Sequence, residues 1–287
     1  MSKSLELSFE FFPPKTPELE GKMWDAIEQL SSLEPAFVSV TFGAGGSTRD
    51  HTHRIATDIL KRTKLKAAAH LTCARATRAE VDEIARSHWA AGINHIVALR
   101  GDPPRNVFEY VPPKESYRYA TDLIEGLRKI GDFEISVAAF PEKHPESPSF
   151  EQDIEVLKRK EAMGAKRAIT QYFFDNSHYL RLRDRAEAAG VKIPIIPGII
   201  PINHFANIKR FSEMCGTSVP ASMEKRFIGL DENPVARDQE AIAFAAEQCQ
   251  SLIAEGATRF HFYTMNRADL IQGVFDAIGS RKSAAFA

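Results

Sequence analysis

The sequence has few of the features that mark nucleic-acid-binding, membrane or secreted proteins. Its 37 Lys and Arg residues against 38 Asp and Glu give a net charge of -1, so there is no basic excess to neutralise a phosphate backbone or an anionic membrane. No window approaches the ~20 consecutive apolar residues of a membrane span, and the opening MSKSLELSFEFFPPK lacks the apolar segment of a secretion signal. We therefore expect a cytoplasmic protein whose partners are neither nucleic acid nor membrane.

Cysteine is also scarce. Cys73, Cys215 and Cys249 are scattered along the chain, odd in number and never spaced as CxxC. This pattern argues against a disulfide framework and against a structural zinc site, so we expect no metal. Three isolated thiols fit a reducing cytoplasm.

Short β-branched or aromatic runs alternate with longer amphipathic stretches along the whole chain, which is the pattern of strands followed by helices. The strands are expected at residues 5–12, 36–42, 66–72, 93–99, 133–140, 165–173, 192–198 and 259–264. The helices are expected at residues 17–32, 49–62, 78–90, 116–130, 149–163, 177–189, 203–214, 234–255 and 266–279.

Eight strand and helix units favour an α/β fold of the (β/α)8 TIM-barrel type. The alternative is an open doubly wound sheet, which more often has five or six strands and a glycine fingerprint after the first. The stretch GLDENPVARD (229–238) is a loop signal, but composition does not change across it, so residues 1–287 are expected to form a single domain. The last residues, near 280–287, are expected to be a flexible tail.

In such a barrel the residues at the carboxyl ends of the strands face a shared mouth. Polar or aromatic groups expected there are Glu10, Thr41, His70, Arg100, Asp102, Phe140, His144, Gln171, Tyr263, Asn266 and Arg267. Glu10 interrupts the apolar run SFEFF, so burial should raise its pKa and could keep it protonated as a general acid. The alternative is a Glu paired with an arginine inside the barrel.

Three other patterns favour structural roles when considered alone. GAGGSTRD (43–50) has Thr48 where GxGxxG needs glycine and has no GK[ST], so Ser47 and Asp50 are better explained as a helix capping box. HTH (51–53) places two histidines on diverging faces of a helix, which is poor metal-ligand geometry. The cations and Asp153 in QDIEVLKRK (152–160) fit a solvated helix face, and Phe9, Phe11 and Phe12 fit the core.

Nine stretches together resemble the methylenetetrahydrofolate reductase family in its short bacterial form, without the regulatory domain of the eukaryotic enzymes. They are SFEFFPPK, FVSVTFGAGGSTRD, AAAHLTC, HIVALRGDPP, ISVAAFPEKHPES, LKRKEAMGAKRAITQYFFD, IIPGIIPI, PASM and FHFYTMNRA, and they extend from residue 8 to residue 268. The resemblance implies a (β/α)8 barrel that binds FAD without a Rossmann motif.

The activity implied by the resemblance is reduction of 5,10-methylenetetrahydrofolate to 5-methyltetrahydrofolate, which supplies methyl groups for methionine synthesis. NADH or NADPH would first reduce the flavin, and the folate would then use the same site in a ping-pong scheme. By the same resemblance Glu10 would protonate folate N10, and Asp102 would stabilise the iminium cation and influence the flavin potential. A homo-oligomer is also implied.

The resemblance assigns further residues and reverses the structural reading of 152–160. Those expected to contact FAD are Thr41, Ala44, His70, Arg100, Gly101, Asp102, Tyr119, Ala120, Phe140, His144, Asp153, Arg159 and Lys160. Those expected to contact substrate are Gln171, Phe211, Tyr263 and Arg267. Two other hypotheses stay open: a metal-dependent barrel hydrolase that uses histidines and Asp102, and a catalytically idle protein that binds folate or flavin.

Overall fold

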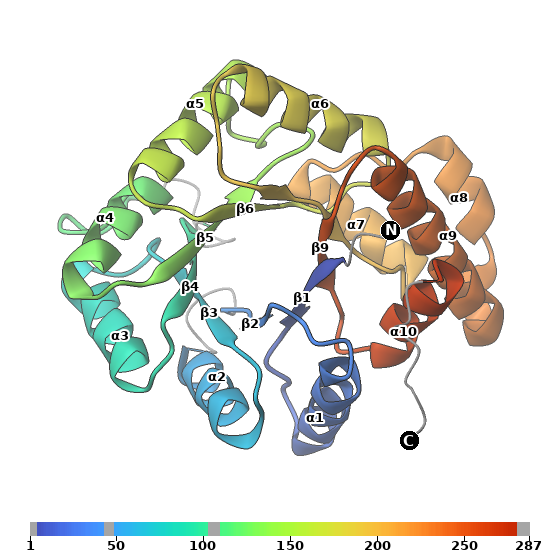
Figure 1. Ribbon diagram of the computed structural model, residues 1–287, viewed down its shortest axis with the longest axis horizontal. Coiled ribbons are helices and arrows are strands. Elements are labelled where there is room, and N and C mark those ends of the chain that lie inside the picture. Colours follow the sequence, from blue (N-terminus) through green and yellow to red (C-terminus); the bar gives the residue numbers. More distant parts are fainter. Residues whose placement is uncertain (1–4, 43–48, 103–109, 280–287) are drawn as a thin grey trace.

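The computed structural model describes residues 5–42, 49–102 and 110–279, which form one barrel of parallel strands surrounded by helices (Figure 1). The strands are β1 (Glu6–Phe11), β2 (Phe37–Val40), β3 (Ala67–Thr72), β4 (His95–Leu99), β5 (Glu134–Ala139), β6 (Arg167–Thr170), β7 (Ile195–Ile196), β8 (Gly198–Ile199) and β9 (Arg259–Tyr263). Their order is β7-β6-β5-β4-β3-β2-β1-β9-β8, and neighbours are parallel. The (β/α)8 class predicted from the sequence is confirmed.

One chain segment closes the barrel by serving as both ends of the sheet. β7 pairs with β6, and β8, which begins only two residues after β7 ends, pairs with β9. Pro197 lies between them and has no N–H to donate, but its carbonyl oxygen accepts from His261 N at 3.0 Å. The single strand predicted at 192–198 is therefore wrong in its detail, because the proline divides it into two short pieces that occupy the seventh barrel position.

The helices lie outside the strands and shield their outer face (Figure 1). They are α1 (Pro17–Ser31), α2 (Arg49–Arg62), α3 (Arg78–Ala90), α4 (Ala120–Ile130), α5 (Phe150–Ala162), α6 (Asn176–Ala188), α7 (Phe205–Cys215), α8 (Ala221–Phe227), α9 (Pro234–Ala254) and α10 (Ala268–Ala277), with a 3-10 turn η1 (Leu230–Glu232). Side-chain caps fix several starts: Thr77 and Glu80 form a capping box at α3, and Ser149 caps α5.

Two helix predictions need correction. The helix expected over 116–130 begins only at Ala120, because the preceding chain is extended at Tyr119 and directs the Tyr117 hydroxyl to donate to Asp82 of α3 at 2.8 Å. A helix at α8 was not predicted at all; it follows Pro220 and buries Met223 and Phe227. The predicted flexible tail at 280–287 and the Ser47 cap lie outside the described residues.

The alternation of side chains along β1 separates the outer core from the barrel interior. Phe9 and Phe11 are fully buried and belong to the large cluster of strands and helices, as predicted. Phe12 is 39% exposed, so its predicted place in the core is wrong, since the strand ends one residue earlier. Residues of the opposite parity, including Ser8 and Glu10, point inward.

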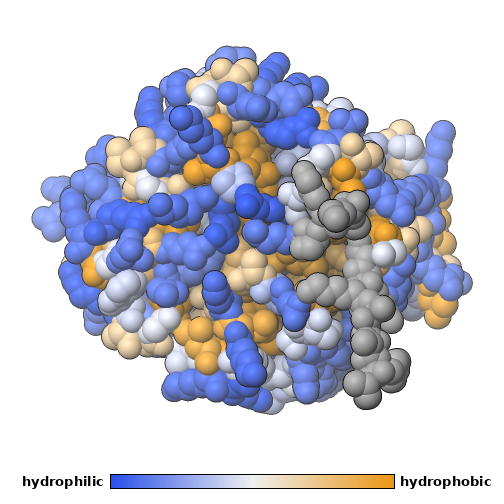
Figure 2. Space-filling model, viewed as in Figure 1, coloured by the Kyte–Doolittle hydropathy of each residue, from blue (hydrophilic) through white to orange (hydrophobic). Residues whose placement is uncertain are grey.

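The surface in Figure 2 is mainly hydrophilic over the outer helices, with hydrophobic residues visible between them. The longest helix, α9, has 21 residues and mixes charged with apolar side chains. Across the ranges that the structure describes, no helix combines the length and the apolar character needed to cross a bilayer.

Closure of the barrel depends on Gly198, where a Cβ atom would overlap the carbonyl oxygen of Thr170 and lie 2.7 Å from Cε2 of Tyr263. We expect Gly198→Ala to lower the free energy of unfolding by ~1–3 kcal/mol, the usual cost of overpacking, because the Thr170 oxygen is backbone and cannot move aside. Gly21→Ala is the control, since that Cβ meets nothing within 4 Å and alanine should stabilise helix α1. Urea unfolding measures both, and a G198A protein as stable as the parent would contradict this description of closure.

Candidate active site

A buried carboxylate and two histidines meet inside the barrel near its mouth. Glu10 of β1 has a side chain only 17% exposed, and its Oε2 lies 3.2 Å from Nε2 of His70 in β3 and 3.5 Å from Nε2 of His261 in β9. The register explains the convergence, because Glu10 pairs with Tyr263 and Ser8 pairs with His261 across the β1 and β9 ladder. Both ring nitrogens are buried, and neither makes a hydrogen bond of good geometry within the described structure.

The electrostatics of Glu10 differ from the prediction. Burial raises the pKa of its carboxyl, but the charge of His70 and the contacts with His261 and His70 outweigh burial and lower the pKa to about 2. The expected protonated carboxyl is therefore wrong for the ligand-free protein, and so is the alternative of an arginine partner. The partners are histidines, which only the folded barrel brings together.

Tyr263 is the last residue of β9, and Gln171 directly follows β6. The Tyr263 hydroxyl donates to the carbonyl oxygen of Thr170 at 2.7 Å, and its ring contacts the His261 ring edge-on, with centroids 5.3 Å apart. Burial raises the pKa of Tyr263 well above its ordinary value, so the phenol is neutral. Gln171 follows β6, and its Oε1 accepts from Tyr172 N at 3.0 Å. That contact leaves the Gln171 amide nitrogen available to a ligand's acceptor.

A second group of polar side chains links the ends of β4 and β5. Arg100 Nη1 forms an ion pair with Glu146 Oε2 at 2.6 Å, and His144 N donates to Asp153 Oδ2 of α5 at 2.8 Å. Phe140 packs edge-on against the His144 ring at 4.6 Å between centroids. Burial, followed by the charge of Arg100, lowers the pKa of His144, which favours a neutral ring at physiological pH. Four of the residues expected to contact FAD thus form one contiguous surface.

Lys160 and Arg159 occupy the last turn of α5. Lys160 Nζ donates to the carbonyl oxygen of Ala138 in β5 at 2.8 Å, which points the ammonium toward the strand rather than into solvent. Burial lowers the pKa of Lys160 to about 8, against the opposing charge of Asp153. Arg159 is exposed. The helix therefore provides one sheltered and one exposed cation beside the β5 end.

The backbone after β4 is shaped by Gly101, which has φ +81°. A Cβ there would lie 2.8 Å from Cβ of Thr72, so the position requires glycine both for its conformation and for the approach of β3. Asp102 follows with an exposed side chain, while its carbonyl oxygen accepts from Arg75 Nε at 3.1 Å. The contact with Arg75 thus holds the Asp102 backbone, while the Asp102 side chain is exposed.

The remaining predicted residues differ in their exposure and in their contacts. Thr41 is half-buried at the end of β2, where its carbonyl oxygen accepts from Thr52 Oγ1 at 2.8 Å. Tyr119 is 60% exposed, whereas Ala120 is buried at the start of α4. Phe211 is 36% exposed on α7, and Arg267 is engaged by Asp238 and Asp269. Ala44 lies outside the described residues.

The sequence reasoning missed His261 and Ser8. His261 Nδ1 lies 2.8 Å from Ser8 Oγ, and both side chains are buried. The signal was present, because in RFHFY the residues at positions 259, 261 and 263 must share one face of a strand. Assigning Tyr263 to the interior therefore placed His261 there too.

The residues at the mouth fit a flavin dinucleotide. Gly101 offers a surface without a side chain, and Arg100, Arg159 and Lys160 offer positive charge for phosphates. Within the parts of the chain that the structure describes, no cluster of three His, Cys, Asp or Glu side chains has the geometry to hold a metal ion.

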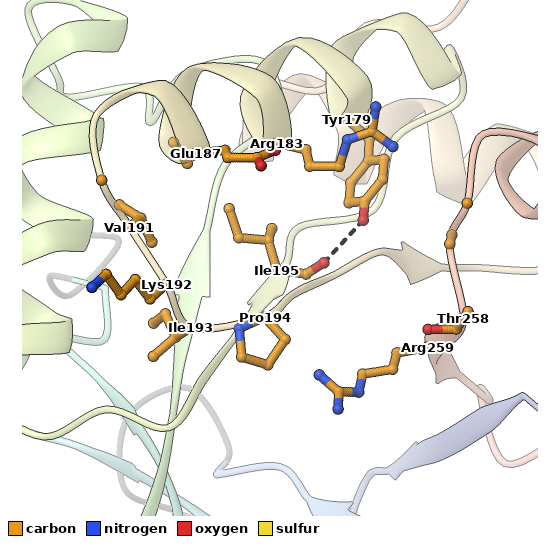
Figure 3. A pocket seen from close by; sticks show the side chains of 14 residues that line it. Tyr179, Arg183, Glu187, Val191, Lys192, Ile193, Pro194, Ile195, Thr258 and Arg259 are labelled. Carbon is orange, nitrogen blue, oxygen red and sulfur yellow. Dashed lines mark hydrogen bonds between the residues drawn. The ribbon is translucent and has the colours of Figure 1, made fainter.

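A surface pocket of ≈ 570 Å³ lies elsewhere, at the amino-terminal ends of β7 and β9. Figure 3 shows its lining, with Tyr179 and Arg183 of α6 above the segment that leads into β7 and with Arg259 on the other side. The Tyr179 hydroxyl donates to the carbonyl oxygen of Ile195 at 2.9 Å. None of the predicted site residues lines this pocket, so it is separate from the mouth.

A parallel barrel whose interior carries a carboxylate between two histidines, beside a cationic rim, has the architecture of a (β/α)8 enzyme. The family model described as methylenetetrahydrofolate reductase matches residues 1–279, and this chain belongs to that family.

Similar proteins agree with this assignment. The chain is 47% identical to the 5,10-methylenetetrahydrofolate reductase of Pectobacterium carotovorum subsp. carotovorum, covering 98% of this chain and 92% of that protein. It is also 47% identical to the Escherichia coli (strain K12) protein of the same name, covering 96% and 92%. An uncharacterized Clostridium thermocellum protein that binds two copies of 5-methyl-5,6,7,8-tetrahydrofolic acid has the same fold, with a TM-score of 0.65 at 15% identity, covering 96% of this chain and 94% of that one.

Proposed function

We propose that this protein is an FAD-dependent oxidoreductase that uses NADH or NADPH to reduce 5,10-methylenetetrahydrofolate to 5-methyltetrahydrofolate. The observation that carries the proposal is Glu10, a sheltered carboxylate in contact with His70 and His261 at the mouth of a barrel of this family. The product would supply methyl groups for methionine synthesis. The proposal includes a homo-oligomeric protein with these small molecules as its partners.

The residues of this chain would bind FAD and place charged groups beside it. Bound FAD would supply the hydride-carrying centre between the nicotinamide and the folate. Arg100, Gly101, His144 and Phe140 would lie along it, while Lys160 and Arg159 would attract its phosphates. Thr41, His70, Asp153, Tyr119 and Ala120 complete the proposed contacts, and the Arg100 and Glu146 ion pair would hold the rim in place.

Toward the folate, the chain would supply a proton and an opposing charge. Glu10 would give a proton to N10, which opens the five-membered ring and leaves a 5-iminium cation. The exposed carboxylate of Asp102 would stabilise that cation. Gln171 and Tyr263 would orient the pterin from β6 and β9, with Phe211 stacking on the substrate and Arg267 holding its acidic end.

The proposed cofactor gives the direct experiment. We expect purified protein to be yellow, to release FAD on denaturation and to bleach when NADH or NADPH is added without oxygen. The dinucleotide is proposed because of α5, since a mononucleotide would lack the second phosphate and the adenosine that the charges of Lys160 and Arg159 would hold. Mass spectrometry identifies the released cofactor and absorbance follows bleaching. Finding FMN would contradict the assignment of a dinucleotide. A colourless protein that binds no added FAD would contradict the proposed function.

Lys160 gives a pH-dependent prediction. Its pKa of about 8 in the ligand-free protein means that it loses its charge as pH rises from about 7 to about 9.5, and a charge-assisted contact to phosphate is then weakened. We expect the affinity of the apoprotein for FAD to fall ~10-fold over that interval. Lys160→Arg should abolish the fall, because arginine stays charged.

Lys158→Arg on the same helix is the matched control, because Lys158 pairs with Glu155 at the surface and should not affect binding. Fluorescence titration with FAD measures each affinity. An equal fall in the parent and in K160R would assign the pH dependence to another group.

A further inference from the structure

Arg267 lies in the loop between β9 and α10, at the mouth end of the barrel. Its neighbour Asn266 ties this loop to the end of β1, because Asn266 Oδ1 accepts from Phe12 N at 3.2 Å and Asn266 Nδ2 donates to the carbonyl oxygen of Phe12 at 3.0 Å. Arg267 N donates to the carbonyl oxygen of Thr264 at 2.9 Å. The Arg267 backbone is therefore fixed by contacts that do not involve its side chain.

Two carboxylates occupy most of the Arg267 guanidinium. Asp269 of α10 makes a two-point contact, in which one oxygen accepts from Nε at 2.7 Å and the other accepts from Nη2. Asp238 of α9 accepts from Nη2 at 2.6 Å. A guanidinium has five N–H groups, so these contacts use the proton of Nε and both protons of Nη2. Among the residues that the structure describes, none makes a hydrogen bond with Nη1 of Arg267.

The charges around Arg267 cancel. The second oxygen of Asp238 accepts from Arg237 Nε at 3.3 Å and from Arg237 Nη2 at 3.2 Å. Two arginines therefore alternate with two carboxylates, and an anionic ligand would meet little net attraction from the four side chains. The Asp238 side chain is 24% exposed and that of Arg267 is 33% exposed, so water screens their charges only in part.

We propose that Asp238 is a specificity-determining residue that limits the affinity of this site for the acidic end of the folate. It does so through Arg267, by occupying Nη2 and by cancelling the charge of the guanidinium. The inference rests on the proposed function, in which Arg267 holds that acidic end.

The donors that remain on Arg267 determine how a substrate carboxylate would bind. Arginine usually binds a carboxylate through two parallel N–H groups on one edge, and Asp269 already has the edge formed by Nε and Nη2. A glutamate carboxylate of the folate is left with the two protons of a single nitrogen, Nη1. Because Asp269 holds the guanidinium plane at two points, the orientation of Arg267 does not depend on the charge of Asp238. Loss of that charge should therefore strengthen binding of the acidic end.

The test is calorimetric titration of the FAD-loaded protein with 5-methyltetrahydrofolate. Asp238→Asn keeps the shape of the side chain and one acceptor oxygen but removes the charge. We expect the affinity of D238N to rise ~2–5-fold, the effect of one partly exposed ion pair, and to fall more steeply with added salt than that of the parent. The diamide of the same folate, in which both glutamate carboxylates are neutral, should bind the parent and D238N equally.

Asp58→Asn is the matched control, because Asp58 of α2 also pairs with an arginine, Arg54 at 3.7 Å, and its side chain is similarly exposed, at 31%. D58N should bind both ligands as the parent does. Arg267→Gln supplies the second comparison: in that background D238N should lose most of its gain, because Asp238 acts through Arg267. A gain that persists in full in R267Q would contradict that route.

An unchanged or weaker affinity of D238N for the folate, or an equal gain for the diamide, overturns the inference. If D238N does not fold, the parent decides, because its affinities for the folate and the diamide should differ by less than ~5-fold and should vary little with salt. A strong, salt-sensitive preference for the acidic form would then overturn it. The two proposals fail separately: a parent that binds neither ligand defeats the proposed function, whereas a parent that binds both without a gain in D238N defeats only this inference.

Discussion

Replacing Glu10 with glutamine is expected to slow the reaction with methylenetetrahydrofolate by ~10²–10⁴-fold, the usual contribution of a positioned general acid. Glutamine preserves the size of the side chain and can still contact His70 and His261, but it cannot pass on an acidic proton. Reduction of the flavin by nicotinamide needs no proton from this position, so that half-reaction should keep its rate. Stopped-flow absorbance at the flavin band measures each half-reaction separately.

Glu6→Gln is the control for this experiment, because Glu6 lies on the same strand but at its amino-terminal end, where it pairs with Arg259 at 3.3 Å. Both half-reactions should be unchanged in E6Q. Equal slowing of the two half-reactions in E10Q would make Glu10 a packing or flavin-positioning residue. If neither slowed, water or another acid must protonate the folate.

Asp102→Asn is expected to slow the folate half-reaction by ~10²-fold, in the range found when one preorganised electrostatic partner of a transition state is removed. The asparagine has a similar shape but no charge to oppose the developing cation. Loss of a negative charge beside the flavin should also make reduction easier, so the flavin potential should rise. Rapid-mixing kinetics and a redox titration against a reference dye measure the two effects.

Asp132→Asn is the matched control, because Asp132 is 96% exposed and pairs with Arg128 in the segment that leads into β5, at the end of the barrel away from the mouth. It should alter neither quantity. An unchanged potential in D102N would remove the electrostatic role of Asp102, even if turnover fell.

The fold could be predicted well because the sequence repeats one local pattern. Short β-branched or aromatic runs alternate with longer amphipathic stretches, and these signals need no knowledge of the rest of the chain. The predicted element boundaries are wrong where contacts with residues distant in the sequence determine the local backbone conformation. Pro197 divides the seventh strand only because its two halves must reach β6 and β9, and the chain before α4 is extended because Tyr117 bonds Asp82 of another helix.

The sequence was enough to predict where the candidate site lies in the barrel, but not the protonation state of Glu10. The rule that barrel mouths gather strand ends placed Glu10, His70 and Tyr263 together, as the structure shows. The pKa of Glu10 was predicted in the wrong direction, because burial alone was visible from the run SFEFF. Its lowering depends on His70 and His261, which are 60 and 251 positions away in the sequence and meet Glu10 only when the barrel closes.

The proposed function requires hydride to pass from a nicotinamide to a methylene folate through a bound flavin. The most direct test mixes anaerobically reduced protein with 5,10-methylenetetrahydrofolate, follows the flavin band and identifies the folate product by chromatography. We expect the flavin to be reoxidised and one equivalent of 5-methyltetrahydrofolate to appear for each flavin. Flavin that stays reduced, or reoxidation that leaves the folate unchanged, would contradict it.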